Sequence, residues 1–395
     1  NALGGSSPLY VVDGTPTSIQ FVNMDDVERL SVLKGPAATA LYGERAAGGV
    51  VEIVTKKAKK GESQVEINHS STLDMVGLLP KYQNEYGGGY SQEWEHFAFD
   101  PTIHPASWKS FDGQNILTYA ADESWGPKLD GRLLPQFDSP LDANGVRTAT
   151  PFVAHPDNVT NFFETGKTYT NNIAITGAND KGDFRLSFTN LSQTGILPNT
   201  DYKRRTVSLN AGWNLTKKLS IRATGNYVVD GSDNRTNWGL YFIWFGRQVD
   251  MEKLKNYQSP NSIYQYNWNY NYWTNPYYVL NLSTKFNQRD RVYGNLAATY
   301  KFNDWLTLTG RSGTDVYIDR RKTKNAARID NLNGAKQFDS YNEEQIFIRE
   351  SNSDVLLSAT RKFGDFDVSA NVGANHRSNY YQRNRSEEHT SELQS

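Results

Sequence analysis

The sequence predicts a β protein: an antiparallel transmembrane β-barrel, incomplete in this chain, with a small α+β domain in front of it. Three observations support this prediction. Long stretches alternate apolar and polar residues with a period of two. The connections between these stretches are alternately short and long. Aromatic residues are abundant, with 23 Tyr, 18 Phe and 9 Trp, although the mean hydropathy is only −0.67.

The composition excludes several other classes of protein. A net charge of −1 gives no reason to expect nucleic acid as a partner. The absence of cysteine excludes disulfides and thiolate metal sites. No run approaches the roughly 18 apolar residues of a membrane-spanning helix, whereas a barrel strand needs only about 9 to 11 residues with one apolar face. A transmembrane barrel is therefore compatible with this hydrophilic composition.

The first sixty residues begin with a strand and a turn. The stretch PLYVVDG at 8–14 is typical of a strand closed by an Asp-Gly turn. Asp25 or Asp26 is expected to cap a short turn. Alternation then predicts a strand over 29–34.

The residues that follow predict a short helix and another strand. Pro36 occupies the expected first position of a helix over 37–42, and Gly43 supplies a left-handed stop. A strand is expected over 50–55, ahead of a lysine-rich run at 56–60 that we interpret as a solvated rim. Together these elements predict a small α+β unit.

In this region the chain resembles the plug of SusC/RagA-type TonB-dependent transporters. The resemblance lies in PLYVVDG, then DDVERLSVLKGPAATALYG, then GGVVEIVTKK, within residues 8–57. The alternative is a small soluble α+β domain with glycine turns. The motif residues, to which we assign a structural role, are Asp13, Gly14, Lys34, Gly35, Pro36, Tyr42, Gly43 and Gly49.

Strands with one apolar face are expected from Gln64 onward. In the stretch 206–215, Val207, Leu209 and Trp213 fall on one side, and polar residues fall on the other. Charged residues on the polar face suit a water-filled lumen better than a packed core. The expected strands are 64–72, 169–177, 183–193, 203–215, 219–230, 290–302, 305–319, 345–362 and 365–379.

The lengths of the connections give a second test of the barrel. Outer-membrane barrels have short turns on the periplasmic side and longer loops outside. Long or medium connections at 73–168, 194–202, 231–289 and 320–344 alternate with short ones at 178–182, 216–218, 303–304 and 363–364. Plugged transporters of this kind have about 22 strands. We therefore expect about half of the wall to be absent from this chain.

The resemblance continues beyond the plug. It lies in NEYGGGY, SWGPKLDG, FFETGKTYTNNIAITG, LPNTDYKR and DRVYGNLAATYKFNDWLTLTGR. It implies that residues 1–60 are the C-terminal part of a plug domain and that residues 61–384 are the first strands of the barrel with long extracellular loops. The N-terminal extension of the family, its TonB box and the first half of the plug are expected to precede Asn1.

The last residues are expected to be foreign to the protein. Alternation stops after about Tyr381, and the chain ends in RSEEHTSELQS at 385–395. One reading frame of a common short-read library adapter encodes this same string. We therefore expect that residues 385–395 are not native, and that they are not attached to the sheet. The alternative is a polar loop that opens toward a further strand.

One long connection, 235–281, is crowded with aromatic rings. Sugar rings stack on aromatic faces, and neighbouring amides can bind hydroxyl groups. We therefore expect a glycan or peptide contact surface there, and the alternative is that the rings pack a folded loop. The candidate substrate-binding residues are Trp238, Trp244, Tyr266, Trp268, Tyr270 and Trp273.

Catalysis, metal binding and cofactor binding are not expected. His96 and His104 lie in an aromatic loop and are interpreted as ordinary histidines. The carboxylate pairs at 25–26 and 343–344 have no partner base, and neither a phosphate-binding loop nor a dinucleotide fingerprint occurs. The chain is therefore not expected to be an enzyme.

The resemblance implies TonB-dependent import of oligosaccharides or peptides across the bacterial outer membrane. The implied partners are the TonB system, a SusD-like surface lipoprotein and outer-membrane lipid. Two alternatives are a TonB-dependent siderophore or cobalamin receptor and, from another class, a secreted β-rich carbohydrate-binding module. A glycosidase is a third.

Overall fold

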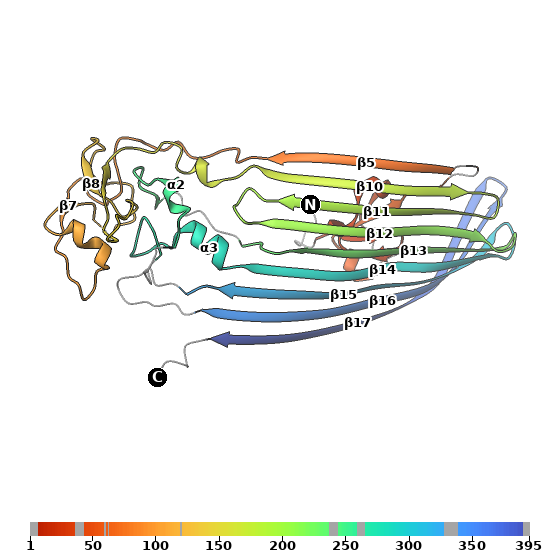
Figure 1. Ribbon diagram of the computed structural model, residues 1–395. Coiled ribbons are helices and arrows are strands. Elements are labelled where there is room, and N and C mark those ends of the chain that lie inside the picture. The colour runs from red at the N-terminus through yellow and green to blue at the C-terminus, as the bar shows by residue number, and fades with distance from the viewer. Residues whose placement is uncertain are drawn as a thin grey trace.

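The computed structural model describes residues 7–35, 43–58, 61, 63–118, 121–236, 244–258, 265–327 and 339–389. These residues form three parts, which Figure 1 shows. A long curved sheet carries a small N-terminal unit, residues 7–58, on one face. The long connections at one end of the sheet form a folded region, here called the loop cap, which comprises the described residues among 75–165 and 233–284.

The sheet contains nine strands in sequence order, each antiparallel to the next. They confirm the nine predicted strands, although several ends differ by more than two residues. The strands are β5 (Ser63–Asp74), β10 (Gly166–Ala178), β11 (Gly182–Thr194), β12 (Asp201–Asn214), β13 (Leu219–Ser232), β14 (Lys285–Lys301), β15 (Leu306–Asn325), β16 (Ser340–Phe363) and β17 (Phe366–His389).

The two faces of this sheet differ as the alternation predicts. On β12 the side chains of Val207, Leu209 and Trp213 are 40%, 42% and 51% exposed and point away from the N-terminal unit, whereas Thr206 and Asn210 are buried on the other face. An apolar face without a protein layer over it is typical of a wall that meets lipid. The prediction that these apolar residues do not face an enclosed core is confirmed.

Short turns gather at one end of the sheet and long connections at the other (Figure 1). In these turns a side-chain oxygen accepts hydrogen bonds from backbone amides. Asn179 Oδ1 accepts from the amides of Lys181 and Gly182 at 2.8 and 3.1 Å, and Asn303 Oδ1 accepts from the amide of Leu306 at 2.9 Å. The predicted alternation of short and long connections is confirmed.

The N-terminal unit is a four-stranded sheet in the order β2-β1-β4-β3. The strands predicted at 29–34 and 50–55 appear as β3 and β4, and the first predicted strand as β1. The predicted helix over 37–42 lies outside the described residues. The elements are β1 (Leu9–Val12), β2 (Thr15–Pro16), β3 (Val27–Leu33), β4 (Val50–Thr55) and the 3-10 turns η1 (Ile19–Phe21), η2 (Met24–Asp26) and η3 (Gly43–Ala46).

The cap of η2 differs from the expectation. Asn23, and not Asp25 or Asp26, caps this turn, because its Oδ1 accepts from the amide of Asp25 at 3.3 Å. Asn23, two residues before Asp25, offers the same kind of acceptor. The carboxylate of Asp26 is thereby left for another partner.

The loop cap has two buried aromatic clusters and several short elements. It was predicted only as loops, yet it packs like a small domain. Its elements are β6 (Glu95–His96), η4 (Ala106–Phe111), β7 (Asn115–Ile116), β8 (Leu133–Pro135), β9 (Ala149–Pro151), η5 (Thr160–Phe162), α2 (Met251–Leu254) and α3 (Pro276–Leu282). No helix in the described ranges is long and apolar enough to cross a membrane.

The C-terminal strand is longer than predicted. Alternation was expected to end near Tyr381 and residues 385–395 to be unattached, but β17 pairs with β16 as far as Ser340↔His389. The expectation is wrong for 385–389, because backbone hydrogen bonds of an antiparallel ladder form without an alternating side-chain pattern. Residues after His389 lie outside the described residues, and the foreign origin of the tail stays a prediction.

Candidate functional site

A buried charge network joins the N-terminal unit to the inner face of the sheet. Arg185 of β11 binds Asp26 Oδ1 at 3.0 Å and Glu66 Oε2 of β5 at 2.8 Å. Lys56 binds Glu66 Oε1 at 2.9 Å, and Ser187 Oγ donates to Asp26 Oδ2 at 2.7 Å. Two cations thus meet two carboxylates, which compensates the charge of the nearly inaccessible Arg185 and Asp26.

An apolar contact lies beside this network. Val12, Val22 and Ile53 of the N-terminal unit pack with Val228 of β13 and Tyr293 of β14, all of them buried. These two wall residues are apolar at the place where the unit covers the inner face. The N-terminal unit therefore completes its small core with side chains of the wall.

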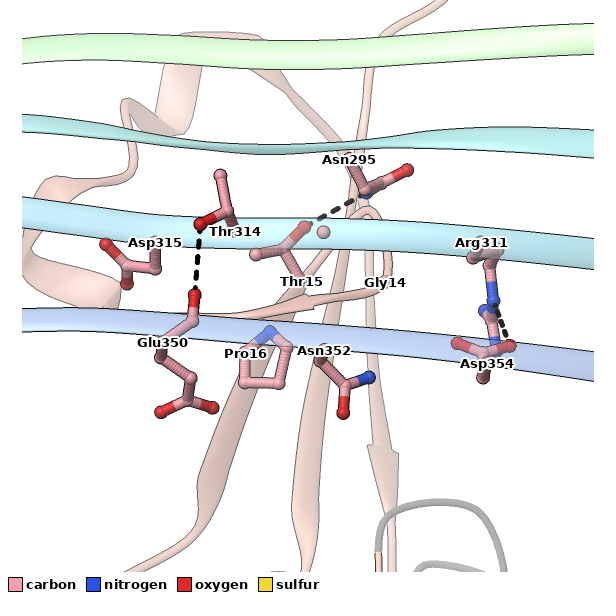
Figure 2. Close-up of a pocket in the computed structure, with 11 residues that line it drawn as sticks. Gly14, Thr15, Pro16, Asn295, Arg311, Thr314, Asp315, Glu350, Asn352 and Asp354 are labelled. Atoms are coloured by element: carbon pink, nitrogen blue, oxygen red, sulfur yellow. Dashed lines mark hydrogen bonds and ion pairs between the residues drawn. The ribbon is translucent and has the colours of Figure 1, made fainter. Parts of the chain in front are cut away.

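The Asp-Gly turn of the N-terminal unit lies against β14, β15 and β16, as Figure 2 shows. Asn295 Nδ2 donates to the carbonyl oxygen of Asp13 at 2.6 Å and to Thr15 Oγ1 at 3.0 Å. Arg311 lines the same polar pocket and binds Asp354 Oδ1 at 2.9 Å. The turn is thus hydrogen-bonded to the wall through Asn295.

The predicted contacts between this unit and the wall arginines are partly confirmed. Arg185 contacts the unit directly, and Arg311 lines the pocket beside Gly14. Arg222 does not: its guanidinium binds Asp183 Oδ1 of the wall at 2.7 Å and Asn210. The Asp183 carboxylate on β11 is within reach of Arg222. The alternation of apolar and polar residues in the sequence does not show which carboxylate an arginine will bind.

The motif residues shape the turns of the N-terminal unit. Asp13 and Gly14 have φ of 47° and 88°, in the left-handed region that an Asp-Gly turn uses. The carboxylate of Asp13 accepts from the amide and the hydroxyl of Thr55 at 3.0 and 2.6 Å. This turn therefore also fixes the end of β4.

Two further glycines in the motif have positive φ. They are Gly35, with a φ of 64°, and Gly49, with a φ of 92°. A Cβ at Gly49 would lie 3.1 Å from a backbone carbonyl oxygen of β3. Of the other motif residues, Lys34 is exposed, Gly43 begins η3, and Pro36 and Tyr42 lie outside the described residues.

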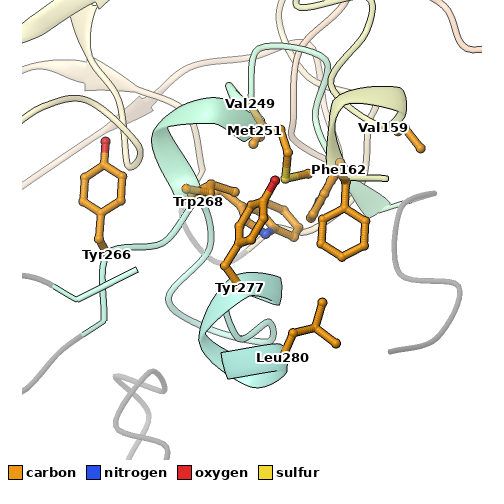
Figure 3. Close-up of a cluster of buried hydrophobic side chains, with 10 residues drawn as sticks. Val159, Phe162, Val249, Met251, Tyr266, Trp268, Tyr277 and Leu280 are labelled. Carbon is orange, nitrogen blue, oxygen red and sulfur yellow. The ribbon is translucent and has the colours of Figure 1, made fainter. Parts of the chain in front are cut away.

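Three of the predicted substrate-binding rings are buried inside the loop cap. Tyr266, Trp268 and Tyr270 are only 7%, 7% and 2% exposed. Figure 3 shows Trp268 within one aromatic cluster, where its ring meets that of Phe245 at 4.6 Å and 80°. These rings pack the fold of the cap and present no open face to a ligand in this conformation. Trp238 lies outside the described residues.

Two other predicted rings reach the surface together. Trp244, which is 37% exposed, stacks on Trp273 with ring centroids 6.4 Å apart and an interplanar angle of 27°. The indole Nε1 of Trp273 donates to Asp122 Oδ2 at 2.7 Å. Burial raises the pKa of the Asp122 carboxyl. The exposed ring of Tyr272 directly precedes Trp273 in the sequence.

Sequence reasoning missed two buried arginines that join the long connections of the cap. Arg247 donates to Asn84 Oδ1 at 3.0 Å, Asn158 Oδ1 at 2.5 Å and the carbonyl of Pro156 at 2.7 Å, above the ring of Tyr82. Burial lowers the pKa of Arg247. Its partners are neutral groups distant in sequence, and no local pattern distinguishes it from a solvated arginine.

Arg147 has a similar position on the other side of the cap. Its guanidinium donates to the hydroxyl of Tyr270 at 2.6 Å and to the carbonyl of Ser139 at 2.8 Å, and it lies 5.2 Å from the ring of Tyr266. Tyr266 and Tyr270 therefore help to hold a buried cation. Their burial favours the alternative reading of these rings as packing groups.

The glycine motifs of the cap mark a close backbone crossing. A Cβ at Gly126 would lie 1.9 Å from the carbonyl oxygen of Gly88, and one at Gly246 would lie 2.4 Å from Gln248 Oε1. The same Gln248 Oε1 accepts from the amide of Gly88 at 2.8 Å. The sequences NEYGGGY and SWGPKLDG therefore carry glycine where two backbones meet.

The histidines of the cap have structural surroundings. His104 stacks on Trp108 at 5.6 Å and lies 4.7 Å from the ring of Phe97, and its Nδ1 accepts from the amide of Asp100 at 3.0 Å. His96 Nδ1 lies 3.3 Å from an amide oxygen of β7. The described residues contain no cluster of three His, Cys, Asp or Glu side chains that could hold a metal.

Comparison with known proteins finds similar sequences and a similar fold. The family model described as the TonB-dependent Receptor Plug Domain matches residues 2–50. TonB-dependent receptor P39 of Formosa agariphila is 26% identical over 233 residues, 58% of this chain and 19% of the relative. TonB-dependent receptor SusC of Bacteroides thetaiotaomicron is 25% identical over 223 residues, 52% of this chain and 18% of the relative. This chain thus covers less than a fifth of either relative.

A shorter match and a solved structure complete the comparison. The rhizobactin receptor of Rhizobium meliloti is 44% identical over 68 residues, 15% of this chain and 9% of that protein. The structure of the RagAB peptide importer in its closed-closed state aligns with a TM-score of 0.64 at 18% identity. The alignment covers 97% of this chain and 46% of the other, and it shows a shared fold.

Proposed function

The chain is related to TonB-dependent receptors of the SusC/RagA type, and on that premise we propose that it is part of an importer for oligosaccharides or peptides in the bacterial outer membrane. The nine-stranded wall lines the conduit, and the N-terminal unit is the plug that obstructs it. The TonB system then supplies the energy that displaces the plug.

The observation that supports this proposal most is how the plug is attached to the wall. Its contacts include the buried pair Asp26–Arg185, the ion pairs Lys56–Glu66 and Arg45–Glu350, a small apolar area and hydrogen bonds at the turn. The inner face of the wall carries ion pairs such as Arg222–Asp183, which suit a wet channel. A plug held by a few specific contacts on a polar wall is suited to controlled release.

The surface pair Trp244 and Trp273 is the proposed substrate contact on this chain. Flat rings bind the C–H faces of sugars or the side chains of peptides, and Asp122 fixes one ring through its indole N–H. We expect Trp244→Ala to lower substrate capture about tenfold. The control is Trp268→Ala, which should lower the thermal stability of the cap.

The experiment that tests the function is deletion of the intact gene followed by complementation. We expect the deletion strain to lose growth on a panel of oligosaccharides or peptides as sole nutrient, and the complemented strain to regain it only with an active TonB system. Uptake of labelled substrate at the wild-type rate in the deletion strain would contradict the proposal.

Import of a siderophore is the second candidate, and the match to the rhizobactin receptor supports it. Growth under iron limitation separates the two functions, because a siderophore receptor affects growth there and a nutrient importer does not. A SusD-like surface lipoprotein is the proposed partner for nutrient import. Co-purification of such a lipoprotein with the intact transporter would support the first function.

A further inference from the structure

Arg204 of β12 differs from the other arginines on the inner face of the wall. Those on β11 and on β13 to β15 each bind a carboxylate. They are Arg185, Arg222, Arg289, Arg291, Arg311 and Arg321. Among the described residues, no carboxylate lies within ion-pair distance of Arg204. Both strands that flank β12 are described, so no further strand of the wall can supply a partner.

This arginine contacts the plug at its cap-side edge. Its Nη1 donates to the carbonyl oxygen of Gln20, an exposed residue of η1. The strand β12 begins near the loop cap and runs toward a short turn, as Figure 1 shows, so Arg204 is closer to the cap than Asn210, which donates to Thr55 of the plug at 2.8 Å. A molecule that enters from the cap therefore reaches the contact between Arg204 and Gln20 before the deeper contacts of the plug.

The hydrogen-bonding capacity of the Arg204 guanidinium is only partly used. A guanidinium has five N–H donors, and here one of its Nη atoms meets the neutral carbonyl of Gln20. Its Nε is buried and has no hydrogen-bond partner in the part of the chain that the structure describes. A neutral carbonyl supplies no counter-charge, whereas a carboxylate supplies a charge and two acceptor oxygens that match the guanidinium fork. Arg204 thus lacks the kind of partner that its neighbours on this face have.

A second arginine without a carboxylate lies nearby. Tyr202 and Arg204 are two residues apart on one strand and therefore share a face. The guanidinium of Arg235, an exposed residue, lies 5.1 Å from the centre of the Tyr202 ring, and no described carboxylate is within ion-pair distance of it. Asp230 pairs with Arg204 in the ladder, and its carboxylate accepts from the Tyr202 hydroxyl at 3.3 Å. One carboxylate beside two arginines leaves an excess of positive charge here.

We propose that Arg204 binds a carboxylate of the imported molecule, and that the substrates are therefore acidic oligosaccharides or acidic peptides. The acid replaces the Gln20 carbonyl as the acceptor, because a charge-assisted hydrogen bond is stronger than a neutral one. Arg235 binds a further acidic group, beside the ring of Tyr202. Binding of the substrate thereby releases the cap-side edge of the plug from β12. This inference rests on the proposed function, since it names the chemical class of the substrate.

Native mass spectrometry of the intact transporter in detergent tests the preference for an acid. The probes are short oligouronates and aspartate-rich peptides, each with its methyl-esterified counterpart. We expect at least one acid to bind the wild-type protein about tenfold more tightly than its ester, and Arg204→Gln to bind the two forms equally, because a charge-assisted contact is lost. Arg204→Lys keeps the charge but not the fork, so it should retain part of the preference. The acid that binds identifies the substrate as an oligosaccharide or a peptide.

The matched control is Arg205→Gln. Arg205 is the next residue of β12, is exposed on the opposite face and likewise has no described carboxylate within ion-pair distance, so its removal changes the net charge equally. This variant should bind acid and ester like the wild type. Arg235→Gln should weaken binding of the acid. Heat-dependent gel migration checks that every variant retains a folded barrel.

Hydrogen exchange at η1 separates substrate binding from a merely structural role of Arg204. The acid should accelerate exchange at Gln20 and its neighbours in the wild type, because it takes over the donor that holds the Gln20 carbonyl. In Arg204→Gln this exchange should already be fast without a probe, and the acid should add nothing. The ester should have no effect on either protein.

Three outcomes would overturn the inference. They are binding of neither acid or of acid and ester equally by the wild type, an unchanged preference for the acid in Arg204→Gln, and loss of that preference in Arg205→Gln. Nutrient uptake by the deletion strain is measured in parallel. Uptake that depends on the gene, together with equal binding of acid and ester, would refute the acidic substrate and leave the proposed function standing.

Discussion

Asp26 is the plug residue that should matter most for the attachment of the plug to the wall. Asp26→Asn would leave Arg185 buried with Glu66, which Lys56 also binds, as its remaining carboxylate. Removal of one partner of a buried ion pair lowers the free energy of unfolding by about 3–5 kcal/mol. We expect faster proteolysis of the plug and a lower unfolding temperature in Asp26→Asn, measured on the intact transporter.

The control for this variant is an exposed ion pair in the loop cap. Asp130 binds Arg132 at 2.6 Å, with 53% of the arginine and 38% of the aspartate side chain exposed. Such pairs contribute about 0–1 kcal/mol, so Asp130→Asn should behave like the wild type. Equal effects of the two substitutions would show that the buried pair does not hold the plug.

His104 should make the loop cap sensitive to acid. Burial lowers the pKa of His104 in the folded cap below its ordinary value of about 6.5. The unfolded segment therefore binds the proton more readily, so stability is full above about pH 6.5 and is lost as the pH falls toward the folded-state pKa. Protonation also removes the Nδ1 acceptor for the amide of Asp100.

Hydrogen exchange of residues 95–116 measures this effect. Exchange should accelerate when the pH falls from 7.5 to 5, after correction for the intrinsic rate, and His104→Phe should weaken that dependence. His96→Gln, in the neighbouring β6, is the control and should leave it unchanged. The nearest carboxylate, Asp100, has a pKa lowered chiefly by its hydrogen bonds with Thr102, so it stays ionised over this range.

Among the elements of the chain, the backbone crossing at Gly126 should decide whether the loop cap folds. A methyl group at this position would overlap the carbonyl oxygen of Gly88. Gly126→Ala should therefore separate the two backbones and expose the cap to protease, while the wall still inserts. Gly77→Ala, in the same connection but with open space around its Cβ, should leave the cap intact.

The strands could be predicted from the sequence and the cap could not, and the reason is physical. Each wall strand has an apolar outward face and a polar inward face, so a two-residue period is imposed locally. The cap is held by contacts between distant residues, such as Arg247 with Asn84 and Asn158. Its aromatic residues were noticed, but burial of Trp268 and Tyr270 depends on how the long connections pack.

For the whole molecule, the position of the plug on the inner face could be predicted, but most of its contacts could not. The resemblance to a plug domain predicts that the N-terminal unit lies inside the wall. The unit is also too small to bury a core alone, so it is expected to pack on the wall. The partners of each charge depend on register and depth, so Arg185 was expected to meet the plug and does, whereas Arg222 was expected to and binds the wall. The outward-facing apolar side chains, in contrast, follow from alternation alone.

The proposed import requires the plug to move relative to β15, and a reversible cross-link tests that requirement. A Cβ at Gly313 would lie 3.3 Å from Thr15 Oγ1, so the pair Thr15→Cys and Gly313→Cys is close enough for a disulfide. This part of the chain contains no native cysteine that could compete. Ser312→Cys with Ser353→Cys is the control, because their hydroxyl oxygens are 2.9 Å apart on two wall strands and do not touch the plug.

We expect the oxidised Thr15–Gly313 cross-link to abolish uptake and a reductant to restore it, whereas the control cross-link leaves uptake unchanged. Substrate capture should persist in both, because the proposed contacts Trp244 and Trp273 lie in the loop cap and not at the plug. Capture without uptake would place the block at the plug. Normal uptake with the Thr15–Gly313 disulfide fully formed would mean that this turn stays on the wall during import, and that any opening occurs elsewhere along the plug, such as at Asp26 and Arg185.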